Sequence, residues 1–404
     1  VQANGSTLPA AGSIVSPTGQ VNIDRSTVLT DPDNQNEATT YLIHSIYKRE
    51  LSANASLKNI TYFQHLQREE IAQNSFVEII DGADTAQNRT ELTYSWNDEQ
   101  QTIFAFDVRY NKVLGYSQFT TEADLPIDLT GPLSNRRIPL TDAQKARLVE
   151  LRPGVFVSPG AQYDIDNDGS GDFNLSDTTD SRSWQTGFAI QQDSDWTDKL
   201  HTSVGYRVDY YDVEARDPIA PQGQIAASDS INDTLQSGQV SFNYKLNADF
   251  TGYGAASYNE ATSNSMAGGN VLGGGNVISA QNFATENTLV EFGLKYAPAN
   301  SDWYADGAVF SQRRSLRNRD GSNTGIRTTG FESQVFYDAY PYWLSAGYSY
   351  IDARYDNSAS SQDSAQVADA FDNSRPDIIA GTGVGAPSFT PFSPSNSQVQ
   401  GIPE

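Results

Sequence analysis

The sequence has no cysteine, one methionine, three histidines and no long hydrophobic run. Without cysteine there can be no disulfide bond, no thiol catalysis and no thiolate metal site. So few histidines and methionines argue against direct capture of haem or of a soft metal. No apolar run approaches the roughly 18 residues that a transmembrane helix needs. The first residues show no basic start followed by an apolar stretch, so no signal peptide is expected, and the chain reads as mature or as a fragment.

Basic residues are also few, with 26 Lys and Arg against 50 Asp and Glu, which gives a formal charge of −24. Such a surface argues against nucleic acid as a partner. The acidic excess falls mainly in segments without an apolar pattern, where it either keeps loops soluble or attracts cations. A hydrophobic fraction of 37% is small for a compact interior of 404 residues. A β-barrel needs apolar residues only at alternate positions of its strands.

A two-residue period is the main pattern that the sequence does contain. Residues 102–110 read Thr-Ile-Phe-Ala-Phe-Asp-Val-Arg-Tyr, so Phe, Phe, Val and Tyr point one way and Ala, Asp and Arg the other. Residues 200–210, 240–246 and 290–295 repeat the alternation. Tyr (21), Phe (18) and Trp (5) are plentiful, which suits aromatic girdles at the two membrane interfaces. One face of each strand is therefore expected to meet lipid and the other water.

The connections alternate between short polar turns, such as residues 97–99 and 247–249, and long polar loops, such as 74–89, 119–180, 215–233 and 317–325. In outer-membrane barrels short turns face the periplasm and long loops face the outside. We therefore predict an all-β fold, a portion of an antiparallel transmembrane β-barrel with about twelve strands. The predicted strands cover residues 39–49, 54–73, 90–97, 100–118, 181–193, 198–214, 234–246, 249–262, 286–297, 302–316, 326–338 and 342–355.

A soluble β-sandwich also alternates, but the long strands and the systematic difference between turns and loops favour the barrel. We expect residues 1–37 to form an irregular lead-in, residues 38–357 to form the barrel strands, and residues 358–404 to form a loop that leads to a further strand. The sequence has no final amphipathic strand with a terminal aromatic residue, so a piece of a larger barrel is the simpler expectation.

Five of these segments, in order, resemble strands of TonB-dependent outer-membrane receptors. They are residues 205–209 (GYRVD), 253–260 (YGAASYNE), 286–296 (ENTLVEFGLKY), 329–334 (TGFESQ) and 344–353 (LSAGYSYIDA). The resemblance implies a ligand-gated active transporter in the Gram-negative outer membrane, most often for a ferric siderophore or another scarce nutrient. It also implies coupling to the TonB protein through a plug domain, but this sequence shows neither a plug nor an energy-coupling box. Outer-membrane lipid and lipopolysaccharide are the expected surroundings.

One loop carries a metal-binding pattern of its own. Its carboxylates match positions 1, 3, 5 and 9 of a calcium-binding loop, and a glycine, Gly169, stands at position 6. The four carboxylates belong to Asp164, Asp166, Asp168 and Asp172. Leu175 replaces the usual glutamate at position 12, which excludes an EF-hand proper and leaves Asp177 as a substitute ligand. The alternative is an acidic, flexible loop that binds nothing. Calcium is therefore the one cofactor that the sequence raises.

The remaining candidates are weaker. Four arginines gather at one hairpin end, where they would contact lipopolysaccharide phosphate or an anionic ligand, or simply form a charged rim: Arg313, Arg314, Arg317 and Arg319. A barrel-borne hydrolase would have to use His44, His65 or His201, and no Ser/His/Asp set supports it, so no catalytic residue is assigned. A passive porin-like channel and a calcium-binding surface protein stay open as alternatives to the transporter.

Overall fold

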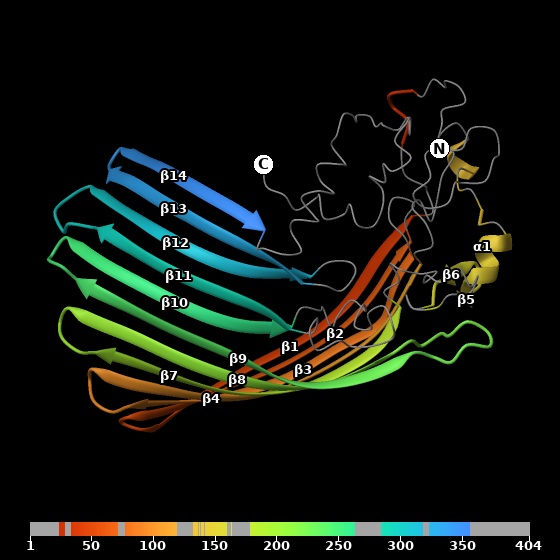
Figure 1. Ribbon diagram of the computed structural model, residues 1–404, viewed down its shortest axis with the longest axis horizontal. Helices are drawn as coiled ribbons and strands as arrows, with labels where there is room; N and C mark the ends of the chain where they lie inside the picture. Colours follow the sequence, from red (N-terminus) through yellow and green to blue (C-terminus); the bar gives the residue numbers. More distant parts are fainter. Residues whose placement is uncertain are drawn as a thin grey trace.

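The computed structural model describes residues 24–28, 34–71, 77–118, 132–135, 137, 139–140, 142–159, 163, 178–262, 284–317 and 323–355. Twelve strands form one antiparallel sheet in which neighbours follow the order of the chain, and the sheet curves into a trough (Figure 1). The strands are β1 (Gln35–Ser52), β2 (Ala55–Ile71), β3 (Val77–Ser95), β4 (Gln100–Gln118), β7 (Thr179–Asp195), β8 (Leu200–Arg216), β9 (Ser228–Lys245), β10 (Phe250–Thr262), β11 (Ala284–Tyr296), β12 (Trp303–Arg317), β13 (Asn323–Ala339) and β14 (Tyr342–Tyr355). The predicted antiparallel sheet of about twelve strands is confirmed.

Polar side chains close the short turns, as the hairpin chemistry predicts. Asn97 accepts a hydrogen bond from the backbone N–H of Glu99 at 3.0 Å, and Asn247 accepts bonds from Asp249 and Phe250 at 2.9 and 3.0 Å. Such side chains replace the backbone partners that the turn residues lack. The turns therefore hold successive long strands in register with two to six connecting residues.

Two of these turns share a tryptophan that begins the turn and bonds to the next strand. The indole N–H of Trp96 donates to the hydroxyl of Thr102 at 2.7 Å, and that of Trp196 donates to Thr202 at 2.8 Å. Both rings stay exposed. An exposed ring whose N–H is satisfied suits the boundary between an apolar and a wet layer. The two tryptophans therefore lie where the sequence predicts an aromatic girdle, at the turn end of the sheet.

The other end holds the elements between β4 and β7 (Figure 1): η1 (Leu133–Asn135), α1 (Asp142–Arg147), β5 (Val149–Arg152) and β6 (Val155–Val157). The backbone N–H of Ser158, just after β6, donates to the carbonyl of Ser117 in β4 at 2.7 Å. Two clusters of buried apolar residues form at this end, one around Val157 and one around Val213. Within the described ranges no helix is long and apolar enough to cross a membrane.

Two predicted loops are partly strand. β3 begins at Val77, although residues 74–89 were predicted to be a loop. Asp81 and Gly82 lie within this predicted loop, but the sheet contains them as a bulge between Ile80 and Ala83, with Gly82 at a φ of 126°. Glycine is the residue that adopts this conformation readily. β9 likewise begins at Ser228, six residues before the predicted start, in a polar stretch whose one apolar residue is Ile231.

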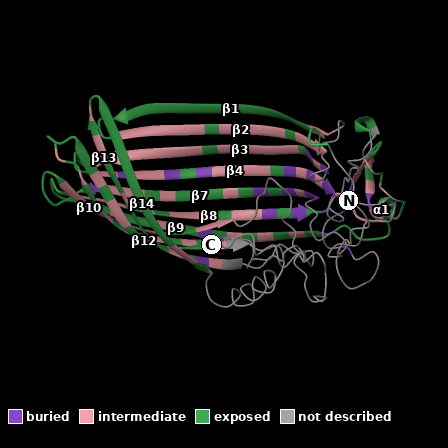
Figure 2. Ribbon diagram, turned by 90° about the horizontal axis from the view of Figure 1, so that it is seen from above, coloured by how far each residue is buried: buried purple, intermediate pink, exposed green. Residues whose placement is uncertain are grey.

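β1 and β14 stand first and last in the order of the sheet. Among the described strands each pairs on one side only, β1 with β2 and β14 with β13. Both are exposed along almost their whole length (Figure 2). An exposed strand edge offers a row of unpaired N–H and C=O groups to another strand. The sheet is therefore open at β1 and β14.

Candidate functional site: the charged inner wall

The two faces of the sheet differ in kind, and register assigns residues to them because directly paired residues point to the same side. One continuous row of directly paired residues crosses β9 to β13: Phe242, Gly254, Phe292, Val309 and Phe331. The four side chains of this row are exposed, Phe292 by 54%. Exposed apolar rows on alternate positions are what a lipid-facing barrel surface requires. We call this side of the sheet the outward face.

The opposite, inward face carries ionised residues that contact one another across strands. The Lys58 ammonium lies 3.0 Å from Glu91, which also accepts a bond from Arg89 at 2.8 Å. Arg89 in turn lies 3.8 Å from Asp107. These contacts link β2, β3 and β4. Each positive group faces a carboxylate, so the charges largely compensate one another within the wall.

The chain of contacts continues through Arg207 of β8, which skips over β7 to reach β4. Its guanidinium donates to both oxygens of Asp107, at 2.7 and 3.0 Å, and its Nε donates to Asp209 at 2.6 Å. Gln185 of β7 adds a bond to Asp209 at 2.9 Å. Asp107 is only 2% exposed and Asp209 only 7%. We call the six ionised residues the charge ladder: Lys58, Glu91, Arg89, Asp107, Arg207 and Asp209.

Gly187 makes the reach of Arg207 possible. It lies on β7 directly between Asp107 and Asp209, with which it is paired in register. A Cβ atom here would come within 2.2 Å of an Arg207 guanidinium nitrogen and 2.5 Å of an Asp209 oxygen. The missing side chain is therefore the gap through which the guanidinium crosses the strand.

We expect Gly187→Ala to destabilise the folded protein by about 1–3 kcal/mol, the usual cost of overpacking a well-filled site. The added methyl group would push the Arg207 guanidinium out of its fork with Asp107. Urea unfolding of the purified full-length protein measures the change. Gly115→Ala is the matched control. Gly115 also faces inward, but a Cβ atom there would lie 3.8 Å from its nearest neighbour, the backbone oxygen of Ile79, which is an ordinary contact. Equal stability of the two variants would show that the gap is unimportant.

A hollow of about 390 Å³ adjoins the ladder on the inward face. Small residues, among them Ala105 and Ala189, leave the space, and Arg89 and Arg207 line it together with amides from β7, β9 and β10: Gln191, Gln239 and Asn259. Guanidinium and amide groups are donors for anionic or oxygen-rich molecules. The wall beside the ladder can therefore hold such a molecule or a polar protein segment.

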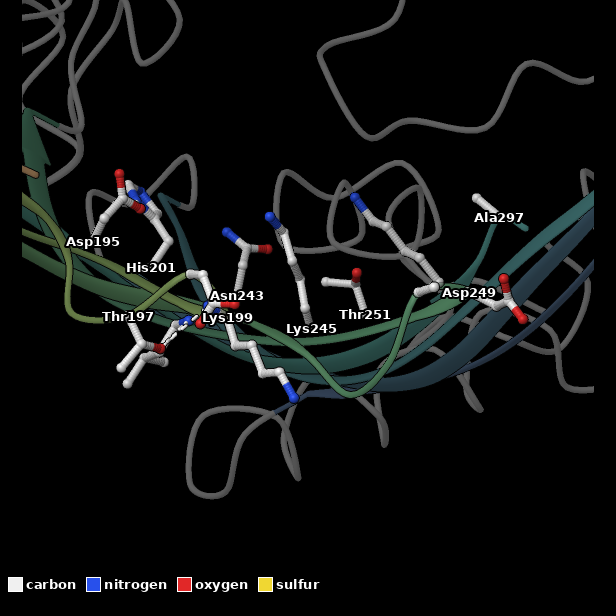
Figure 3. Close-up of a pocket in the computed structure, with 13 residues that line it drawn as sticks. Asp195, Thr197, Lys199, His201, Asn243, Lys245, Asp249, Thr251 and Ala297 are labelled. Carbon is white, nitrogen blue, oxygen red and sulfur yellow. Dashed lines mark hydrogen bonds and ion pairs between the residues drawn. The ribbon is translucent and has the colours of Figure 1, made fainter. Parts of the chain in front are cut away.

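A second hollow, of about 300 Å³, lies at the turn end of the inward face (Figure 3). His201 and Asp195 lie together at one side of it, 2.9 Å apart, and Lys245 lies beside Asn243 and points away from Lys199 (Figure 3). Its lining lysines, Lys199, Lys245 and Lys295, form no ion pair within the described part of the chain, so this hollow is better suited to an anion than the compensated ladder is.

Lys295 also lines the turn-end hollow, and it places its ammonium 5.1 Å from the centre of the Tyr253 ring. That ring lies over Gly293, where a Cβ would come within 2.3 Å of it. A cation over an aromatic face is held by the ring quadrupole. The arrangement fixes one positive charge of the hollow without pairing it to a carboxylate.

The sequence raised other candidates, which the structure treats differently. Asp164, Asp166, Asp168 and Asp172 lie outside the described residues, so calcium binding stays a prediction. Within the described part, no group of three or more His, Asp or Glu residues is placed to hold a metal. The histidines pack locally, His65 against Asp84 at 2.7 Å and His44 against the ring of Tyr62.

Two arginines of the predicted cluster of four, Arg313 and Arg314, lie on opposite faces of the sheet. Arg313 pairs with Arg327 and shares the outward face with Val309, whereas Arg314 pairs with buried Ile326 and points inward. Neighbours in a strand point to opposite faces, which is why Arg313 and Arg314 cannot contribute to the same patch. The side chain of Arg317 and all of Arg319 lie outside the described residues.

Sequence reasoning placed Asp107, Arg207 and Asp209 on the polar side of their strands but did not join them into a ladder. A family model described as TonB dependent receptor-like, beta-barrel, matches residues 3–399. No curated protein sequence matches the chain closely enough to count as a relative.

Solved structures resemble the fold. The siderophore receptor PiuA from Acinetobacter baumannii superposes with a TM-score of 0.57 at 14% identity, over 82% of this chain and 49% of its own. The ferric yersiniabactin uptake receptor FyuA from Yersinia pestis gives 0.57 at 13%, over 81% and 44%. The copper transporter OprC gives 0.51 at 14%, over 81% and 46%. This chain therefore spans just under half the length of each.

Proposed function

Because the chain belongs to the TonB-dependent receptor β-barrel family, we propose that it forms part of the wall of an outer-membrane active transporter. The family comprises receptors and transporters of the Gram-negative outer membrane, not enzymes. The observation that carries the proposal is the pairing of an apolar outward face with an inward face that bears the charge ladder. A polar, charge-bearing inner wall belongs to a barrel that encloses a lumen.

The ladder supports transport because it stiffens the wall and leaves neighbouring donors available. Buried carboxylates on β4 and β8 are held by Arg207, so the strands around the hollow are tied together at mid-height. Arg89 and the amides of Gln191 and Gln239 line the space beside them. These groups suit a small molecule rich in carboxylate or other oxygen donors.

We propose a scarce nutrient carried as a small-molecule complex as the cargo, with a ferric siderophore as the first candidate. PiuA and FyuA, by their descriptions, handle siderophores, whereas OprC is a copper transporter, so the fold alone does not select the cargo. Import against a gradient would draw energy from TonB through a plug domain, and outer-membrane lipid and lipopolysaccharide would surround the outward face.

Deleting the gene is expected to lower uptake of its ferric siderophore at least about tenfold under iron limitation, where uptake needs high affinity. Cells would be given a panel of ferric siderophores labelled with radioactive iron, with and without a plasmid copy of the gene. The same panel in cells that lack TonB distinguishes an active transporter from a passive porin-like channel. A passive porin-like channel would keep its uptake without TonB, and an active transporter would lose it.

A further inference from the structure

Aromatic side chains stand on both faces of the sheet at the turn ends of β12 and β13. On the outward face Trp303 stacks on Tyr337, with ring centres 4.7 Å apart, in the position of a lipid-interface girdle. The adjacent residue of each strand points inward and repeats the arrangement, because Tyr304 is paired with Phe336. The two inward rings are nearly parallel, at 12°, with centres 4.6 Å apart. Contact with lipid does not account for this second pair, since it faces the lumen.

The inward pair leaves part of its ring surface uncovered. Tyr304 is 40% exposed, and the residue paired with Phe336 on β14 is Ser345, whose side chain is too small to cover a ring. Trp343 lies two residues from Ser345 on the same face and is 62% exposed. We call Tyr304, Phe336 and Trp343 the inner aromatic surface. It offers ring surface to a molecule in the lumen.

Two carboxylates bracket the inner aromatic surface on the inward face. Asp306 follows Tyr304 by two positions on β12, which places it farther from the turns than the rings. Asp338 follows Phe336 by two positions on β13, which runs the other way, so this carboxylate lies nearer to the turns. Both are exposed, and neither forms an ion pair within the described part of the chain. The rings therefore lie between two uncompensated negative charges.

One ammonium lies near these carboxylates, and it is turned toward a ring. Lys295 of β11 is paired with Asp306 in register, yet its ammonium lies 5.1 Å from the centre of the Tyr253 ring. Toward the loops, the inward face of β11 and β13 adds Glu291 and Glu332. This part of the wall has a net negative charge, unlike the compensated charge ladder. A positively charged molecule is therefore the complementary occupant of the inner aromatic surface.

The spacing of the bracketing carboxylates selects among positively charged molecules. Asp306 is paired with Gln334, which precedes Asp338 by four residues on β13, a distance of about 14 Å at roughly 3.4 Å per residue. The rings occupy the space between. A flexible chain with an amine at each end spans such a distance, and its methylene groups lie against the rings while each ammonium meets a carboxylate. A compact cation with a single charge would reach only one carboxylate.

We propose that the inner aromatic surface binds an aliphatic polyamine, a molecule of the class of spermidine, at the turn end of the lumen. The terminal ammonium groups bind Asp306 and Asp338, and the aromatic rings contact the chain between them. Exposed ion pairs are individually weak, so binding depends on one molecule making both contacts. From the proposed function the inference takes only that the inward face encloses water. It does not depend on the cargo or on the source of energy.

Titration calorimetry of the full-length protein in detergent measures the binding of spermidine. We expect the double variant with Asp306→Asn and Asp338→Asn to bind at least about tenfold more weakly than the wild type, and Phe336→Leu at least about threefold more weakly. Butylamine, which carries a single ammonium, should bind the wild type at least about tenfold more weakly than spermidine does.

Two variants are matched controls and should bind spermidine like the wild type. Tyr337→Leu removes the ring next to Phe336 on the same strand, from the stack that faces outward. The double variant with Asp180→Asn and Glu214→Gln removes the same amount of charge from β7 and β8, where arginines already compensate both carboxylates. Heat-dependent migration on gels checks that the variants fold, and Asp338→Asn alone serves if the Asp306 and Asp338 double variant does not.

Absence of spermidine binding by the wild type would overturn the site. Equal weakening in the two double variants would do the same, because it would reveal a general effect of net charge. Tighter binding of a lysine-rich peptide, with the same dependence on Asp306 and Asp338, would assign the surface to a polypeptide in place of a polyamine. Uptake of the cargo is measured separately, so spermidine binding without uptake counts against the transport function alone.

Discussion

Replacing Arg207 with methionine is expected to destabilise the folded protein by about 3–5 kcal/mol, because it leaves a buried charge without its counter-ion. Asp107 is only 2% exposed and receives two hydrogen bonds from this guanidinium. Its other positive neighbour, Arg89, is 3.8 Å away and is also engaged by Glu91. Urea unfolding of the full-length protein in detergent, followed by tryptophan fluorescence, measures the loss.

Arg182→Met provides the matched control for this substitution. Arg182 of β7 also pairs with a carboxylate, Glu214 of β8, but the two side chains are 58% and 48% exposed. Exposed pairs contribute less than about 1 kcal/mol. Adding Asp107→Asn to Arg207→Met should restore part of the stability, because an amide needs no counter-ion. Equal losses at Arg207 and Arg182, or no rescue by Asp107→Asn, would show that the ladder does not hold the wall together.

The strands themselves were within reach of sequence reasoning. Alternation is a local property, and the short turns carry their own chemistry, as Asn97 and Asn247 show. The errors in the predicted strand bounds were also local. The apolar alternation at the start of β3 is short, with Val77 and Ile79 on either side of Glu78, and the bulge at Gly82 changes the register after Ile80, so the pattern on one side of the bulge does not continue on the other. The apolar residues Val77, Ile79 and Ile80, all buried, are the signal that could have revealed this start.

The functional side chains were out of reach for a different reason. Asp107 and Arg207 are 100 positions apart, and their contact depends on the register of two strand pairs and on the gap at Gly187. The pairing of Arg313 with Arg327 has the same origin. Sequence adjacency grouped Arg313 with Arg314, which face opposite sides, whereas strand pairing groups Arg313 with Arg327. Sites on a sheet are assembled across strands, so they become visible only when the register is known.

A charge placed on the apolar outward face is expected to destabilise the protein strongly. Phe242→Arg is expected to destabilise the protein by about 2–4 kcal/mol, the cost of an arginine near the middle of the lipid-facing band. Phe242 is exposed, paired with Gly254, and its ring lies over that glycine beside the ring of Phe292. The substitution therefore loses an apolar contact and also places a charge in hydrocarbon.

Ser241→Arg is the control, one residue away on the same strand and on the inward face, where it is paired with Ser203 and Ala255. An added cation there meets the polar lumen and should change the stability by less than about 1 kcal/mol. Urea titration of folding into lipid vesicles compares the stabilities of the two variants in a lipid bilayer. If Ser241→Arg were the more damaging change, the inward face would be the one in contact with lipid, and the charge ladder would lie on the wrong side for a lumen. A clear penalty at Phe242 alone would place the ladder inside the barrel, where a transporter needs it.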